Sequence, residues 1–159
     1  MNRTLLLLMI CPFFFGFIET SAGQNISTLQ KTRIEQQIDS VFQCSIKAAE
    51  QLAYDQLSKG VDDRHKAGFI SNGTYFAQYD SLIDLVKARS QGIAKQSISV
   101  KQSKITVLSE QIVLLAATGN SNIEVTDGST FSVKFFWTFV YEKSGNEWKV
   151  IQSHQSDFR

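Results

Sequence analysis

The residues best suited to acid–base chemistry lie near the end of the chain, between Trp148 and Ser156. This segment has the pattern of a β-strand, in which alternate side chains share a face. Strand parity groups His154 with Trp148 and Val150, so a core-facing Trp148 turns His154 inward. In an apolar pocket, an imidazole can act as a general acid or base near neutral pH. The alternative is that His154 only fixes the strand end through a hydrogen bond.

Aromatic residues elsewhere in the chain are candidates for the lining of the same pocket. Together with His154, the predicted ligand-binding set contains Tyr54, Phe69, Tyr79 and Trp137. Such a set fits a small hydrophobic ligand that is held by a few polar groups. For each of these aromatic residues, packing in the core is the competing interpretation.

The sequence predicts neither a metal site nor a cofactor. Its two histidines, His65 and His154, have no cysteine or carboxylate cluster at the spacing of zinc ligands. The charges are balanced, with 16 basic and 15 acidic residues. Because no basic stripe is present, nucleic acid is not expected as a partner.

The N-terminus has the layout of a secretory signal peptide. A basic start, an almost wholly apolar run over residues 5–18 and small residues at 21–23 follow one another. The run is shorter than the ~20 residues of a transmembrane helix. We predict cleavage after Gly23, no stable membrane span in the mature chain, and an exported protein, periplasmic or extracellular. A retained anchor and a lipoprotein modified at Cys11 are the alternatives.

The rest of the chain is long enough for one domain. We divide the sequence into a signal peptide at 1–23, a flexible N-terminus at 24–31 and a single domain at 32–159. Cleavage of the leader leaves Cys44 as the one cysteine, so an internal disulfide is not expected. Its apolar neighbours favour a small buried side chain over a reactive thiol.

The elements that must position these residues begin with helices. Apolar residues at helical spacing predict one long helix or two shorter ones over residues 32–59, with a capping box that starts at Thr32. A further helix is predicted at residues 81–94, with a capping box that starts at Ser81.

Strands make up the remaining elements. Asn72-Gly73 predicts a tight turn between two short strands at 67–71 and 74–77. After Gln96 the hydrophobic period changes to two, which predicts four consecutive antiparallel strands: 98–107 with a bulge near Gln102, 112–126, 130–143 and 147–156. This order predicts an α+β fold, with helices packed on one face of a curved antiparallel sheet.

The strand at 130–143 has one aromatic face, from Phe131 to Tyr141. Its opposite face is mixed, and there Phe136 and Val140 stand out as apolar. Partial cover by a second subunit explains this pair and predicts a homodimer. Edge packing within one subunit is the alternative.

Three segments give the chain a family resemblance: the hairpin GFISNGTYF, the helix YDSLIDLVKA and the ending WKVIQSHQS. With the order of elements, they resemble the SnoaL-like group of the nuclear transport factor 2-like superfamily, over roughly residues 32–157. The resemblance implies a cone-shaped, cystatin-like α+β barrel, in which the curved sheet wraps around the N-terminal helices and a pocket opens at one end. Members include isomerases, dehydratases, hydrolases and cyclases, and others only bind ligands or dimerise.

The catalytic sets of those enzymes are incomplete in this chain. The resemblance to the isomerases places Asp62 and Asp63 near the catalytic base, but their charged neighbours favour solvated turn acids. The aromatic face of residues 130–143 offers no second acid, and the aspartate and arginine set of the hydrolases is not evident.

Three functions therefore remain open. The leading prediction is binding of a small hydrophobic molecule in the pocket. The first alternative is an isomerase, dehydratase or cyclase, with His154 as acid or base and Tyr54 or Tyr79 orienting the substrate. The second is a dimerisation or interaction module whose cavity is filled by aromatic side chains.

Overall fold

A computed structural model describes residues 26–158, and within that range the chain forms three helices and six strands. The predicted signal peptide and its cleavage site lie outside the described residues. Among the described helices, none combines the length and the apolar character that a bilayer crossing needs.

Helix α1 (Thr28–Glu50) forms because apolar residues recur every fourth position. Its buried stripe runs through Ile34, Ile38, Phe42 and Ile46. The helix begins four residues earlier than predicted, because the Ser27 hydroxyl caps it by accepting a hydrogen bond from the Gln30 amide at 3.2 Å.

Cys44 is exposed, so the prediction of a buried cysteine was wrong. The reason is helical geometry, because each residue advances ~100° around the axis. Cys44 lies two positions from both Phe42 and Ile46, which turns it to the face of α1 opposite the buried stripe.

A break separates α1 from α2 (Tyr54–Lys59), so the predicted helical region divides into two helices. Leu52 adopts a positive φ of 54°, which ends the first helix. The short hairpin follows as predicted, with β1 (Phe69–Ser71) and β2 (Thr74–Phe76) joined by Asn72 and Gly73, both at positive φ.

Helix α3 (Tyr79–Arg89) is displaced from its predicted range. It begins two residues earlier, after Gln78, and Ser81 is not its cap. It also ends earlier, because the chain turns at Gly92 with a φ of 86° and enters a strand at once.

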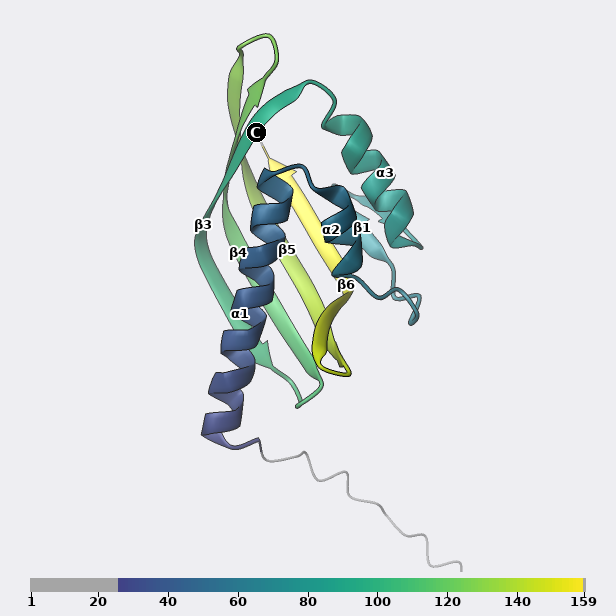
Figure 1. The fold of residues 1–159 in the computed structure, drawn as a ribbon, viewed down its shortest axis with the longest axis vertical. Helices are drawn as coiled ribbons and strands as arrows, with labels where there is room; N and C mark the ends of the chain where they lie inside the picture. The colour runs from purple at the N-terminus through teal and green to yellow at the C-terminus, as the bar shows by residue number, and fades with distance from the viewer. Residues whose placement is uncertain (1–25, 159) are drawn as a thin grey trace, which may run out of the picture.

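The long strands are β3 (Ile93–Val107), β4 (Ile112–Val125), β5 (Thr130–Ser144) and β6 (Glu147–Phe158). They pair consecutively and antiparallel, and β1 adds to β6 in parallel, in the order β2-β1-β6-β5-β4-β3. A register shift between Val100 and Gln102 confirms the predicted bulge. Figure 1 shows the sheet curving around α1, which confirms the α+β fold class.

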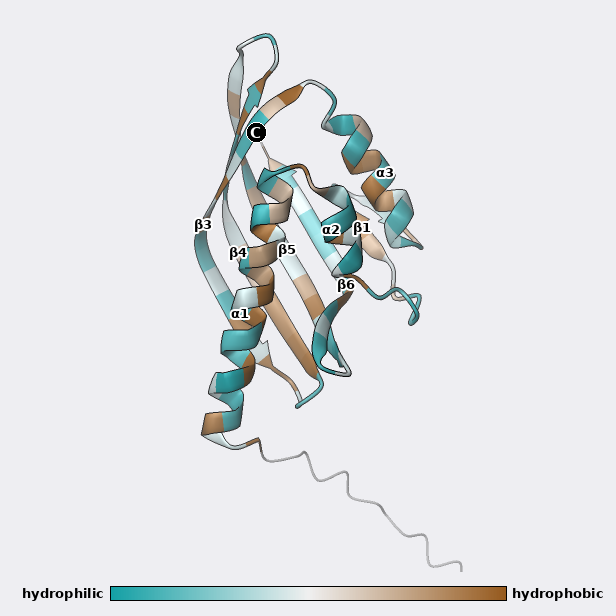
Figure 2. Cartoon of the chain, in the orientation of Figure 1, coloured by the Kyte–Doolittle hydropathy of each residue, from teal (hydrophilic) through white to brown (hydrophobic). Residues whose placement is uncertain are grey.

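The helices lie on one side of this sheet, which we call the inner face (Figure 1). Apolar side chains of α1 and of the strands form one buried cluster there. Figure 2 shows hydrophobic residues both on α1 and on the strands behind it. The core holds Phe42 of α1, Phe135 and Tyr141 of β5, and Trp148 of β6, all buried. The opposite side, the outer face, is covered by no helix of the described residues.

A bulge in β6 reverses the predicted orientation of His154. Tyr141 pairs with Val150, but the next pair joins Val140 to Gln152, so Ile151 is an extra residue in β6. Beyond it Ser153, with 0% exposure, faces the core together with Trp148 and Val150. His154 instead lies on the outer face, which corrects the prediction from simple alternation.

Candidate functional site

A cavity of about 90 Å³ lies on the inner face, between the helices and strands β5 and β6. Its wall is mostly apolar and comes from α1, α2, the segment after α2, α3 and the two strands. The lining residues are Phe42, Ser45, Ile46, Ala49, Leu57, Gly60, Val61, Tyr79, Trp137, Phe139, Val150, Ser153 and Gln155.

Aromatic rings form one wall of this cavity. The ring centroids of Phe42 and Phe139 lie 6.0 Å apart, and those of Trp137 and Phe139 lie 6.3 Å apart. Trp137 also stacks on Phe135 at 3.9 Å, and its indole nitrogen lies 3.4 Å from Asp157 Oδ1. Because Phe135 is fully buried, these contacts hold the Trp137 ring in place.

Polar groups are few in the cavity wall. The Gln155 amide donates a hydrogen bond of 3.2 Å to the hydroxyl of the fully buried Ser153. The Ser45 hydroxyl donates to the Val41 carbonyl at 3.1 Å. Tyr79 supplies a phenol. These uncharged groups can orient a ligand through hydrogen bonds.

Tyr79 is the titratable residue of the cavity wall in the part of the chain that the structure describes. Its ring meets that of Phe69 edge to face at 5.1 Å. Burial raises the pKa of Tyr79 to about 12, so the phenol stays protonated at neutral pH. Burial and the nearby Tyr79 also raise the pKa of Tyr141.

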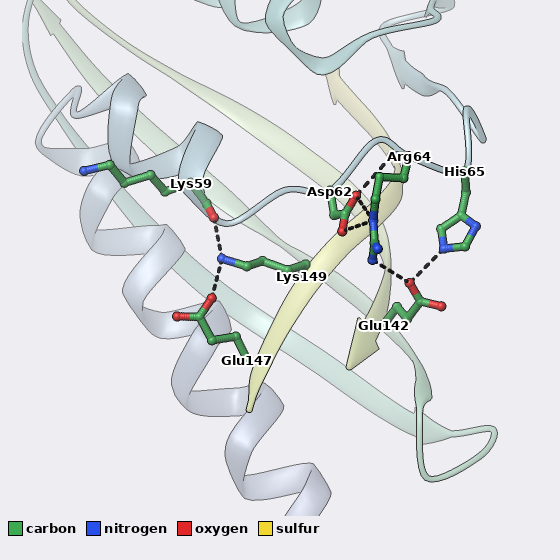
Figure 3. A network of polar contacts seen from close by, with 7 residues as sticks. All are labelled: Lys59, Asp62, Arg64, His65, Glu142, Glu147 and Lys149. Atoms are coloured by element: carbon green, nitrogen blue, oxygen red, sulfur yellow. Dashed lines mark hydrogen bonds and ion pairs between the residues drawn. The ribbon is translucent and has the colours of Figure 1, made fainter. Parts of the chain in front are cut away.

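The segment after α2 closes the cavity on one side and is bonded to β6. The backbone amide of Val150 donates to the Gly60 carbonyl at 2.9 Å, and the amide of Asp62 donates to the Val150 carbonyl at 2.9 Å. Lys149 Nζ also donates to the Lys59 carbonyl at 2.8 Å and pairs with Glu147 at 2.7 Å (Figure 3). Residues 59–62 are therefore anchored along the strand.

A polar network continues this anchorage to β5 (Figure 3). Arg64 Nε lies 2.7 Å from Asp62 Oδ2, and Arg64 also reaches Glu142 at 3.9 Å. His65 Nε2 lies 2.8 Å from Glu142 Oε2. The Arg64 guanidinium holds the pKa of Asp62 below its usual range, so Asp62 is an ionised turn acid.

The structure separates the predicted site residues. Tyr79 and Trp137 lie on the cavity wall. Phe69 is fully buried behind Tyr79. Tyr54 is outside the lining, and its hydroxyl is buried with no hydrogen-bond partner among the described residues. His154 lies on the other side of the sheet, where its Nε2 is 3.2 Å from Ser156 Oγ.

The polar residues that sequence reasoning missed are Ser153 and Gln155. Alternation from Trp148 placed both on the outer face. The available signal was the adjacent apolar pair Val150 and Ile151, which interrupts the alternation at the position of the bulge.

His154 borders a second hollow, of about 660 Å³, on the outer face. It is lined by Gln102, Ser103, Lys104, Ala116, Ala117, Thr118, Phe136, Trp137, Thr138, His154 and Ser156. No carboxylate lines it, so His154 has no acidic partner there to orient its ring. Within residues 26–158, no group of metal-ligating side chains is arranged to hold an ion.

A curved antiparallel sheet around a long helix, with a cavity between them, defines the fold as nuclear transport factor 2-like. The sequence profile of the SnoaL-like domain family matches residues 38–158. The chain therefore belongs to the SnoaL-like domain family, and the resemblance inferred from its motifs is confirmed. A comparison with curated proteins found no match.

Solved structures share this fold. A nuclear transport factor 2-like protein from Salmonella enterica aligns over 81% of this chain and 94% of its own, with a TM-score of 0.71 and 12% identity. Hexachlorocyclohexane dehydrochlorinase LinA-type3 from Novosphingobium barchaimii aligns over 82% and 90%, with a TM-score of 0.69 and 13% identity. A protein with a cystatin-like fold from Caulobacter vibrioides aligns over 79% and 89%, with a TM-score of 0.64 and 12% identity. At these identities the likeness concerns the fold alone.

Proposed function

We propose that this protein binds a small, mainly apolar molecule in the inner cavity and does not transform it by proton transfer. The observation that carries this proposal is the composition of the cavity wall. It joins aromatic rings to the uncharged polar groups of Tyr79, Ser153 and Gln155. Such a wall attracts apolar surface and orients one polar group of a ligand.

Acid–base chemistry in the same cavity lacks suitable groups. No carboxylate or imidazole lines it, and Tyr79 has a pKa far above neutrality. A general acid or base works best with a pKa near the working pH. The candidate acid or base from the sequence, His154, lies across the sheet from the cavity.

The size of the cavity limits the ligand. Its volume of about 90 Å³ equals that of ~3 water molecules in the liquid. One small ring or a short alkyl group fits this space. Leu57 of the wall is on α2, a helix without a buried residue, so we propose that displacement of Leu57 is how the cavity admits a larger ligand.

We also propose that binding takes place outside the cytoplasm, after removal of residues 1–23. The basis is the signal-peptide pattern of the leader. The mass of the mature protein tests this, because cleavage after Gly23 leaves a chain that starts at Gln24. A mature protein that retains Met1 and the apolar run contradicts it.

The experiment that tests ligand binding is native mass spectrometry of the purified mature protein, followed by thermal shifts with a panel of small aromatic and aliphatic compounds. We expect a bound small molecule, or an increase in melting temperature with some of these compounds. Absence of both contradicts the proposal.

A further inference from the structure

We infer that helix α2 is a lid over the inner cavity, and that it opens by a change in the backbone at Leu52. The inference rests on the proposed function, because it concerns access to the same cavity. In Figure 1, α2 lies between α1 and α3, and it contacts both of these helices. Leu57 is the residue of α2 that lines the cavity. Movement of this helix therefore removes one side chain from the cavity wall.

Few interactions hold α2 in the closed position. The helix has six residues, none of them buried, and no side chain caps its first turn. So short a helix is not stable alone and depends on packing against its neighbours. Among the described residues, one polar side-chain contact joins α2 to α3, the exposed ion pair of Asp55 and Lys87 at 3.8 Å. Because an exposed pair contributes little, α2 can open while the rest of the domain stays folded.

The two ends of α2 differ in how firmly they are held. The C-terminal end is fixed to β6, because the Gly60 carbonyl accepts a hydrogen bond of 2.9 Å from the Val150 amide. The N-terminal end follows Leu52, which has a φ of 54° at a place where glycine is the common residue. Strained residues at the ends of elements are suited to act as hinges. The N-terminal end therefore moves about Leu52, and Gly60 is the fixed pivot.

A buried hydroxyl group also favours movement of the N-terminal end. Tyr54 is the first residue of α2, and its hydroxyl is buried with no hydrogen-bond partner among the described residues. Such a hydroxyl costs free energy, which contact with water recovers. A return of Leu52 to negative φ relieves backbone strain at the same time. Both costs belong to the closed position, so opening needs little free energy, and Leu57 then leaves the wall.

The labelling of a buried thiol measures this opening without a ligand. In a Cys44→Ser background, Ser153→Cys places a thiol on the cavity wall, and Val113→Cys places one elsewhere in the core. Both positions are fully buried. Reaction with iodoacetamide is followed at urea concentrations below the unfolding transition. We expect Ser153→Cys to react at least ~10-fold faster than Val113→Cys, at a rate independent of urea, because local opening exposes little surface.

A charge reversal connects the opening to α2. Asp55→Lys replaces the attraction to Lys87 by repulsion, so labelling of Ser153→Cys should become roughly 2- to 5-fold faster, while labelling of Val113→Cys should not change. The matched control is Asp84→Lys, the same change at an exposed position of α3, and it should alter neither rate.

Deuterium exchange of the α2 amides is a second measurement, which needs no cysteine and decides the matter if Ser153→Cys does not fold. We expect these amides to exchange before global unfolding, and faster in Asp55→Lys than in Asp84→Lys. Labelling of Ser153→Cys no faster than of Val113→Cys, exchange of α2 only with global unfolding, or equal effects of the two charge reversals overturns the inference. Because no ligand is used, a failure of ligand binding contradicts the proposed function alone.

Discussion

His154 lies opposite Thr138 in the ladder between β5 and β6, on the outer face of the sheet. Ser153, its neighbour in the chain, lies opposite Phe139 and faces the core. The unpaired residue Ile151 produces this orientation. It removes the one histidine with a candidate catalytic role from the inner cavity and places a serine hydroxyl there instead.

This orientation predicts opposite outcomes for two adjacent substitutions. Ser153→Lys buries a charge in the core and should lower the free energy of unfolding by more than ~3 kcal/mol, or prevent folding. His154→Lys places the same side chain on an exposed position and should change the free energy of unfolding by less than ~0.5 kcal/mol. Urea denaturation of both variants measures the difference. A more damaging change at His154 than at Ser153 would contradict the assigned register.

Filling the inner cavity should abolish ligand binding without unfolding the protein. Ala49 lines the cavity from α1, so Ala49→Leu adds side-chain volume inside it. We expect the thermal shift produced by a bound compound to disappear. Overpacking is expected to cost about 1–3 kcal/mol of stability if the wall cannot adjust. Ala88→Leu, at an exposed position of α3, is the matched control and should bind as the wild type does. Equal binding by both variants would place the ligand elsewhere.

Removal of the Tyr79 hydroxyl tests whether this group orients the ligand by a hydrogen bond, because the shape of the cavity wall stays the same. Tyr79→Phe keeps the ring beside Phe69 but deletes the phenol. If Tyr79 donates a hydrogen bond to the ligand, affinity should fall roughly 3- to 10-fold, the value of one ordinary hydrogen bond. Tyr75→Phe, on an exposed tyrosine outside the cavity, is the control. Calorimetric titration with a compound found by thermal shift gives both affinities, and an unchanged affinity for Tyr79→Phe would refute the role of its hydroxyl.

Tyr79 also makes the fold sensitive to alkaline pH. Its pKa rises from 10.0 to about 12 in the folded chain, because burial disfavours the phenolate. The unfolded chain therefore loses this proton first, and the stabilising contribution is complete below pH ~10 and lost as pH rises through ~12. The loss is on the order of 3 kcal/mol, since each pKa unit corresponds to ~1.4 kcal/mol. Denaturation measured between pH 9 and pH 12, a range that includes the change from 10.0 to about 12, gives the free energy of unfolding at each pH. This free energy should fall less steeply with pH for Tyr79→Phe than for the wild type. Identical slopes would rule out this contribution.

Much of the fold could be predicted from the sequence because local patterns determine it. Ile34, Ile38 and Phe42 specify a helix by their spacing alone, and Asn72-Gly73 specifies a turn by its tolerance of positive φ. These features need no knowledge of distant contacts. The order of the elements and the alternation in β5 then favour one sheet with helices on one side.

The candidate site could be predicted only in part, because one unpaired residue, Ile151, determines which side chains of β6 face the inner cavity. Alternation is a rule for unbroken strands, and the bulge at Ile151 exchanges the faces of everything beyond it. Tyr79 on α3 and Trp137 on β5 lie in elements that this bulge does not interrupt, so their place on the cavity wall could be predicted, whereas the orientation of Ser153 in β6 could not. The start of α1 after Ser27 was missed because Thr32 also has the local pattern of a helix cap.

Native mass spectrometry of the mature wild type and of Ala49→Leu, each titrated with a compound selected by thermal shift, tests ligand binding in the inner cavity most directly. We predict a complex with one bound molecule per chain for the wild type and none for Ala49→Leu, while both remain folded. A wild type that binds none of the compounds, or an Ala49→Leu variant that binds them equally well, would contradict the proposed function.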